Sequence, residues 1–332
     1  MRRMVNKCMA PLFGFFFCVA LVGSMTGFGE AQTQFVSIGT GGTGGVYYPY
    51  GGGLAEIWTK YVKGVRAVAE VTGASVENVK LCDKGESLFG LIMNDVAYQA
   101  YNGVGKFDGT PQKVLGMFQM YPHHYHVVAL KKVEMKSIYD IKGKKVSVGA
   151  PGSGTEFKTN LILQEALGIP YSSFNVHRLS FTETANAMKD GIVEVGFWDV
   201  AAPTSSIMDL STTHDIKVIP FSDEEIEKII TKFPFYSKFL LPANIYRGQD
   251  YEVQNPSVWN TVIANANVDA DLVYQLTKAV FEHQDYMVKI HPFAKYTTPE
   301  NAVTHAVIPL HPGAVRYYKE KGIAVPDRLM PK

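Results

Sequence analysis

Short apolar runs alternate with helical patterns along most of the chain. Residues 35–38 form an apolar run of strand type, and the apolar positions from Leu54 to Val62 recur at the spacing of one helix face. The first series is predicted as strands at 35–38, 65–71 and 88–93, with helices at 54–62, from Ser75, and from a cap at Asn94 or Asp95 to Asn102. This alternation is typical of a parallel sheet covered by helices.

The same alternation begins again near residue 145. The second series is predicted as strands at 145–149, 175–181 and 193–198, with helices at 156–167 and 182–189, followed by a strand at 259–264 and a helix at 269–290. A chain of 332 residues exceeds what one core usually serves, and two similar series predict two α/β lobes. We expect lobe one at 32–125 plus 258–332 and lobe two at 126–257, each a mixed sheet flanked by helices. Two crossing segments then form a hinge.

The two series share a glycine-rich motif. Residues 36–44 read V-S-I-G-T-G-G-T-G, and residues 146–154 read V-S-V-G-A-P-G-S-G. Each copy joins a strand to a helix N-terminus, where backbone N–H groups and the hydroxyl of Thr43 or Ser153 bind carboxylate or phosphate without a basic side chain. Glycine is expected there for close backbone approach and for positive φ. Ser153 with Glu156 also fits a capping box, in which Ser153 serves its own helix.

The first turn also matches the dinucleotide-binding pattern G-x-G-x-x-G over residues 39–44, which raises a dehydrogenase as an alternative. The candidate ribose-binding acid, Glu70, lies 31 residues after Gly39, whereas the fingerprint places it about 20 residues on. No Gly-Lys-Ser/Thr follows either turn, so neither is a phosphate-binding P-loop. We therefore expect a binding protein, with no enzyme activity and no cofactor.

Three histidines, His123, His124 and His126, precede an apolar stretch and offer another candidate chemistry. Two of them share one strand face, which is compatible with metal ligation. No carboxylate or thiol cluster joins them in the sequence, so we expect no metal and favour a solvated or ion-paired crossing segment.

The N-terminus predicts export. Arg2, Arg3 and Lys7 precede an apolar stretch at 8–22, and the small residues around Ala31 fit a signal-peptide cleavage site. We expect 1–31 to be removed and the exported, periplasmic form to begin at Gln32 as a monomer. Cys82 is then the remaining cysteine, and it should be a free thiol. Lys and Arg total 32 against 31 Asp and Glu, so no large field favours nucleic acid as a partner.

Five motifs in order resemble one known family. They are G-T-G-G-T-G-G-V-Y-Y-P-Y-G-G-G-L-A, T-G-A-S-V-E-N-V, N-D-V-A-Y-Q-A-Y-N-G, G-A-P-G-S-G-T-E and I-P-L-H-P-G-A-V-R-Y-Y-K-E-K-G. Together they resemble the TAXI solute receptors of TRAP transporters. The resemblance implies a two-lobed type II periplasmic binding protein. It also implies capture of a small carboxylate-bearing solute, such as a glutamate- or glutamine-like amino acid or a dicarboxylate, and its delivery to TRAP transporter membrane subunits.

The resemblance also implies a set of ligand-binding residues. The implied first wall is Thr43, Gly44, Gly45 and Tyr48, the second wall is Ser153, Gly154 and Thr155, and Ser75, Asn78, Asp95 and Tyr98 lie near the cleft. Asn78 and Asp95 also fit the role of helix caps. The stretch from Tyr121 to Tyr125 and the pair Trp198-Asp199 differ from the family pattern. A periplasmic sensor module for a signalling partner remains an alternative to a transport receptor.

Overall fold

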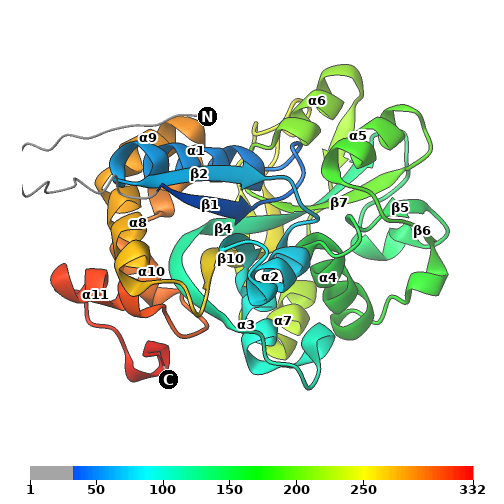
Figure 1. Cartoon of the computed structure of the whole chain (residues 1–332). Helices are drawn as coiled ribbons and strands as arrows, with labels where there is room; N and C mark the ends of the chain where they lie inside the picture. The colour runs from blue at the N-terminus through cyan, green and yellow to red at the C-terminus, as the bar shows by residue number, and fades with distance from the viewer. Residues whose placement is uncertain (1–32, 332) are drawn as a thin grey trace, which may run out of the picture. The chain divides into compact units, whose positions relative to one another are not determined.

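The computed structural model describes residues 33–331 (Figure 1). The predicted signal segment and its cleavage site after Ala31 lie outside the described residues. The strands are β1 (Gln34–Gly39), β2 (Val65–Glu70), β3 (Phe89–Met93), β4 (Val114–Leu130), β5 (Lys145–Ser147), β6 (Asn175–His177), β7 (Val195–Val200), β8 (Ile216–Val218), β9 (Ser237–Leu241) and β10 (Val253–Asn265). Within the described chain they form one mixed sheet of ten strands.

Two groups of parallel strands are joined by two long antiparallel strands. β1 pairs in parallel with β2 and β3, and β5 pairs in parallel with β6 and β7. β10 pairs with β3, while β4 pairs with β10 over its first part and with β7 over its second part. β8 and β9 attach to β4 and β10. The predicted lobe boundaries fall inside β4 and β10; the division into lobes stays a prediction.

Helices cover the sheet. They are α1 (Tyr47–Tyr61), α2 (Ser75–Lys84), α3 (Asn94–Asn102), α4 (Gly154–Asn160), α5 (Phe181–Lys189), α6 (Ser205–Thr213), α7 (Asp223–Lys232), α8 (Ala270–Glu282), α9 (Gln284–Ile290), α10 (Pro299–Thr304) and α11 (Pro312–Glu320). α8 packs on α1 and α11, and Figure 1 shows α1, α8 and α9 grouped beside β1 and β2. No helix within residues 33–331 is both long enough and apolar enough to cross a bilayer.

Local chemistry explains where several helices begin and end. α5 and α7 each begin with a capping box, formed by Ser180 with Glu183 and by Ser222 with Glu225. α2 and α3 end at Gly85 (φ 73°) and Gly103 (φ 64°), in the left-handed region that favours glycine. The alternation of strands and helices predicted from the apolar pattern is therefore present, with boundaries set by these caps.

Several predicted boundaries are wrong. The predicted helix 269–290 is two helices, because the backbone of His283 leaves the helical region between α8 and α9. The predicted helix 156–167 begins earlier, at Gly154, since Ser153 caps it, and it continues as a π-helical segment over Leu161–Ala166. The predicted strand 175–181 ends earlier, with β6, because α5 takes over at Phe181.

The predicted cap of α3 at Asn94 or Asp95 is also wrong. The N-cap position belongs to Met93, and both polar residues lie inside the first turn. Asn94 donates instead to the carbonyl of His305 at 2.8 Å. The two side chains therefore serve other partners, although Asp95 Oδ1 still accepts the N–H of Val96 at 2.8 Å.

The three histidines are buried, which contradicts the solvated segment predicted from the sequence. His123, His124 and His126 lie inside β4, where neighbouring strands on both sides cover them. Burial lowers the pKa of all three imidazoles, to about 4 for His126, so they are neutral at pH 7. Across residues 33–331, no group of three or more His, Cys, Asp or Glu side chains is arranged to hold a metal ion.

Candidate ligand-binding site

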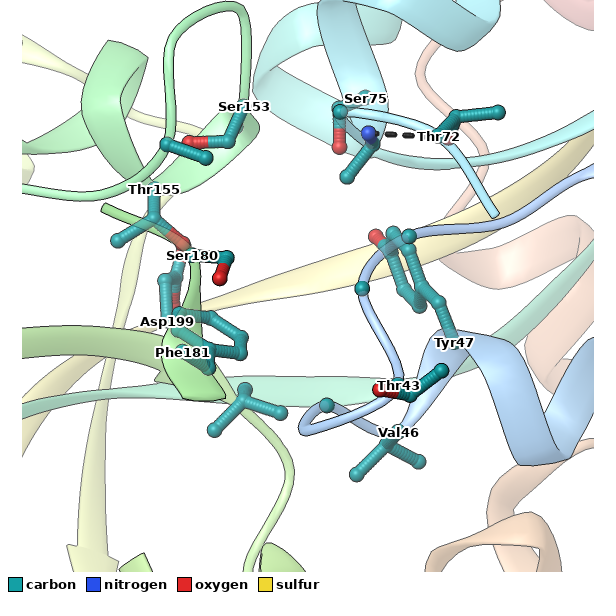
Figure 2. Close-up of a pocket in the computed structure, with 18 of the residues that line it drawn as sticks. Thr43, Val46, Tyr47, Thr72, Ser75, Ser153, Thr155, Ser180, Phe181 and Asp199 are labelled. Carbon is teal, nitrogen blue, oxygen red and sulfur yellow. Dashed lines mark hydrogen bonds between the residues drawn. The ribbon is translucent and has the colours of Figure 1, made fainter. Parts of the chain in front are cut away.

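A cavity of about 400 Å³ lies where the turns that follow β1, β2, β5 and β6 meet (Figure 2). Each of these turns leaves the carboxyl end of a parallel strand, where open α/β sheets bind their ligands. The volume is within the range of small-molecule sites, roughly 300–1,000 Å³. The cavity therefore brings together segments of both strand groups at a position that suits a small ligand.

The first wall is the glycine turn between β1 and α1. Gly41, Gly42, Thr43 and Gly45 line the cavity, and the turn is closed by the Gly45 N–H, which donates to the Gly42 carbonyl at 3.1 Å. Tyr47 follows at the start of α1 and also lines the cavity. This wall thus offers the exposed hydroxyl of Thr43 and the glycine backbone beside it.

The turn between β2 and α2 extends the first wall with Thr72, Ala74 and Ser75. Thr72 accepts the Ala74 N–H at 3.0 Å, and Ser75 Oγ accepts the Met93 N–H at 3.2 Å. Ala74 has φ 72° and ψ −145°, a conformation that costs a residue with a side chain about 1–3 kcal/mol. The wall is held in this form by hydrogen bonds to β3 and within the turn.

The second wall is the glycine turn between β5 and α4. Ser153, Gly154 and Thr155 line the cavity. Ser153 Oγ accepts the N–H of Glu156 at 3.0 Å, so Ser153 caps α4 as predicted. The predicted capping box is incomplete, because the Glu156 carboxylate accepts the N–H of Gly152 at 3.0 Å and not that of Ser153. The hydroxyl hydrogen of Ser153 is still available to a ligand, because a hydroxyl both donates and accepts. The two interpretations of this serine are therefore compatible.

Close approach, and not positive φ, explains Gly44 and Gly154, whereas Gly149 (φ 105°) and Gly152 (φ 74°) of the second turn do have positive φ. Gly44 and Gly154 are not among the glycines with positive φ, so the positive φ predicted for these two residues is wrong. A Cβ on Gly154 would overlap Met93 and lie 2.8 Å from Ser75 Oγ. A Cβ on Gly44 would overlap the Thr182 hydroxyl. Each turn thus packs against a residue of the opposite strand group.

Five of the residues predicted to bind ligand do not line the cavity. Gly44 points its carbonyl away, toward α6. Tyr48 and Tyr98 are 38% and 44% exposed on other surfaces. Asn78 is buried and donates to the carbonyls of Thr40 and Leu91, and Asp95 is buried against Tyr236. The structure brings together the other six: Thr43, Gly45, Ser75, Ser153, Gly154 and Thr155.

A buried charge cluster lies behind the second wall. Lys158 of α4 donates to Asp199 of β7 at 3.1 Å, and both side chains are fully buried. The Lys158 ammonium lies 4.7 Å from the ring centre of Tyr236, whose hydroxyl donates to Asp95 at 2.7 Å. Burial raises the pKa of Asp95 to about 6 and raises that of Asp199 as well. The cluster joins α3 to α4 and β7.

The structure adds cavity residues that the sequence prediction missed. They include Tyr47, Thr72, His123, Ser180, Phe181 and Asp199. Ser180 and Phe181 follow β6 at the same strand-to-helix position as the glycine turns, so the repeated order of strand, turn and helix could have predicted them. His123 and Asp199 belong to the stretches that differ from the sequence pattern of the TAXI receptors. Figure 2 shows Phe181 and Asp199 across the open space from Tyr47 and Thr43.

The profile of one protein family matches residues 38–322, which includes both glycine turns and every residue that lines the cavity. That family is the NMT1-like family. The chain belongs to the NMT1-like family.

Solved structures at low sequence identity share the fold of this NMT1-like chain. A protein from Bordetella bronchiseptica RB50 is 17% identical, with 89% of this chain and 90% of that chain covered and a TM-score of 0.52. A structure from the glutathione import system of Streptococcus mutans, GshT and the cystine ABC importer TcyBC, is 14% identical, with 81% and 99% covered and a TM-score of 0.51.

A putative L-cystine ABC transporter from Listeria monocytogenes is 12% identical, with 80% of this chain and 98% of that chain covered and a TM-score of 0.49. The predicted fold class is confirmed: the NMT1-like chain has the mixed α/β fold of periplasmic solute-binding proteins. The two matches with TM-scores of 0.52 and 0.51, at 17% and 14% identity, show the fold and leave the ligand open.

Proposed function

We propose that this chain is an extracytoplasmic receptor that captures a small carboxylate-bearing solute in the cavity and delivers it to TRAP transporter membrane subunits. The observation that carries the proposal is the convergence of two glycine turns, from two separate strand groups, on one cavity. A ligand that bridges both turns links the two strand groups, and the membrane subunits can then recognise the ligand-bound form of the receptor. We place the receptor in the periplasm.

The donors around the cavity suit a carboxylate. Hydroxyls of Thr43, Ser75, Ser153 and Thr155 line it together with glycine backbone. Hydrogen bonds from neutral donors to a charged acceptor are worth about 1.5–3 kcal/mol each, roughly twice the value for neutral pairs. A carboxylate can therefore be held by hydroxyl and N–H groups alone, without a basic side chain.

The transporter type and the solute class are supported by the resemblance to TAXI receptors. Membership in the NMT1-like family and the periplasmic-binding-protein fold agree with a receptor role. We take the glutamate-like amino acids and dicarboxylates implied by that resemblance as the starting set of candidate ligands. We propose binding without chemistry: His123, the only histidine among the described lining residues, has no hydrogen-bond partner that would make it a base.

Native mass spectrometry of the exported chain, purified without denaturation, tests this proposal. We expect an adduct of a small organic acid that denaturation releases. The double variant Thr43→Ala, Ser153→Ala should be folded and should lack the adduct. A dinucleotide adduct would contradict the proposal and favour the dehydrogenase alternative.

A further inference from the structure

The charged side chains that line the cavity are all acidic. Among the lining residues of the described chain, Glu183 and Asp199 carry charge, and there is no Lys or Arg. Glu183 belongs to the capping box of α5 and accepts the Ser180 N–H at 2.8 Å. Lys158 balances the charge of Asp199, so a solute meets neutral donors and the negative charge of Glu183, with no cation in direct contact.

The nearby cations are already paired. Lys158 is fully buried, and its ammonium donates to Asp199 at 3.1 Å. Arg178 Nε donates to Glu156 at 2.8 Å, and Lys106 Nζ lies 3.8 Å from the same carboxylate. With the hydroxyl and N–H donors of the two turns engaged by one carboxylate, a second carboxylate on the solute would lose its hydration without gaining a positive partner, which strongly opposes burial.

The rest of the lining suits an apolar body. Tyr47 and Phe181 lie on opposite sides of the cavity (Figure 2), and Val46, Met93 and Val200 add aliphatic surface. The Tyr47 hydroxyl donates to Asn260 Oδ1 at 2.5 Å, so its hydrogen is unavailable to a ligand. Aromatic faces of this kind stack on flat or aliphatic groups.

We infer that the solute carries one carboxylate on an apolar or aromatic body, and that solutes with two carboxylates are disfavoured. This inference rests on the proposed function and narrows it. One carboxylate uses the hydroxyl and N–H donors of the glycine turns, and the body lies between Tyr47 and Phe181. The distribution of charge in the lining, which the sequence alone did not reveal, separates this class from glutamate and dicarboxylates.

Titration calorimetry with two matched pairs of solutes tests the inference on the exported full chain. Phenylacetate is compared with succinate, and phenylalanine with glutamate, so that within each pair an aromatic ring takes the place of the second carboxylate and the number of ammonium groups is the same. We expect the member with one carboxylate to bind about 30-fold tighter in at least one pair, because the second carboxylate of its counterpart is left unpaired and no ring lies between Tyr47 and Phe181. Tighter binding of succinate and glutamate would overturn the inference and leave the proposed function standing. No binding of any of the four would contradict both.

Added charge gives a second test with a matched control. Val71 lines the cavity and is 58% exposed, so Val71→Lys places an ammonium at the wall without filling the core. It should strengthen succinate binding by about tenfold. Val68 in β2 is 50% exposed and does not line the cavity, so Val68→Lys should leave succinate binding unchanged. Equal effects of the two variants would overturn the inference, since the missing cation would then not be local to the cavity.

Discussion

The hydroxyl of Ser206 donates a hydrogen bond to the carbonyl oxygen of Gly44 at 2.8 Å. Thr204 donates to the same oxygen at 3.1 Å, so the first glycine turn is attached to the beginning of α6. The two segments belong to different predicted lobes. Because Gly44 itself does not line the cavity, this contact can hold the walls together without touching the ligand.

Removing this contact should weaken binding indirectly. Ser206→Ala deletes the 2.8 Å bond and leaves the Trp198 indole N–H, which donates to the same hydroxyl, without its partner. We expect ligand affinity to fall by about 0.5–1.5 kcal/mol, the net value of one neutral hydrogen bond, as measured by calorimetry. Ser205→Ala is the control. Ser205 is exposed and its hydroxyl lies 3.4 Å from the Gly44 oxygen, so this variant should lose less affinity than Ser206→Ala does. Equal affinities for wild type and Ser206→Ala would rule out this role.

A side chain at Gly44 should be worse than the loss of one hydroxyl. The added Cβ would overlap the Thr182 hydroxyl and lie 3.3 Å from Ser206 Cβ, so the turn would have to move away from α5 and α6. We expect Gly44→Ala to reduce affinity at least tenfold, about 1.4 kcal/mol. Gly52→Ala is the matched control in α1, since nothing lies within 4 Å of its added Cβ. If both variants bind as wild type does, the close approach at Gly44 has no part in binding.

Asp95 should make stability depend on pH. Its carboxyl faces Tyr236, Lys158 and Asp199, and burial raises its pKa from 3.8 to about 6. Ionising a carboxyl whose folded-state pKa is raised costs stability: the cost is fully present above pH 6 and disappears as pH falls toward 3.8. Asp95→Asn has no such cost. The unfolding free energy of the variant relative to wild type should therefore rise by about 2 kcal/mol between about pH 4.5 and pH 7.

Urea denaturation of both proteins at the two pH values measures this difference. Any loss of the hydrogen bond between Asp95 and Tyr236 affects the variant at both pH values, so it cancels in the comparison. A difference that stays constant with pH would show that Asp95 keeps an ordinary pKa in the folded protein.

Cys82 should affect stability but not binding. It is a fully buried free thiol in α2, away from the cavity lining, and burial raises its pKa. Cys82→Ser buries a hydroxyl in an apolar environment and should lower the unfolding free energy by about 1–3 kcal/mol. Ligand affinity should stay within about twofold, as one expects for a site the residue does not touch. A large loss of affinity in a folded variant would mean that the binding site lies elsewhere.

Apolar runs predicted most strands because buried parallel strands are apolar on both faces. β4 is the exception: His123, His124 and His126 interrupt its apolar pattern, yet all three are buried between neighbouring strands. The periodicity of a sequence cannot distinguish a buried histidine from a solvated one. The same limit applies to Asn78, whose buried side chain donates hydrogen bonds to the carbonyls of Thr40 and Leu91.

The cavity was predictable where it depends on one repeated strand-to-helix turn. Thr43 and Ser153 occupy equivalent positions in the two copies, and both line the cavity. Phe181 was missed although it follows β6 at the same strand-to-helix position, whereas His123 and Asp199 were missed because their position depends on how two distant strand groups come together. The charge of the lining has the same origin: Lys158 is close to the second turn in sequence, but its pairing with Asp199 depends on the fold of α4 against β7.

The central claim is that the two glycine turns are two walls of one site, and calorimetry of Thr43→Ala and Ser153→Ala tests it most directly. With the tightest-binding carboxylate of the four solutes above, each variant should lose about 1.5–3 kcal/mol of binding free energy if its hydroxyl meets the carboxylate. Ser222→Ala controls for the lost helix cap, because Ser222 caps α7 in the same way but does not line the cavity. It should lose stability and keep affinity. Normal binding by Ser153→Ala, with binding lost in Thr43→Ala, would show that the second turn is only a helix cap and would contradict the claim.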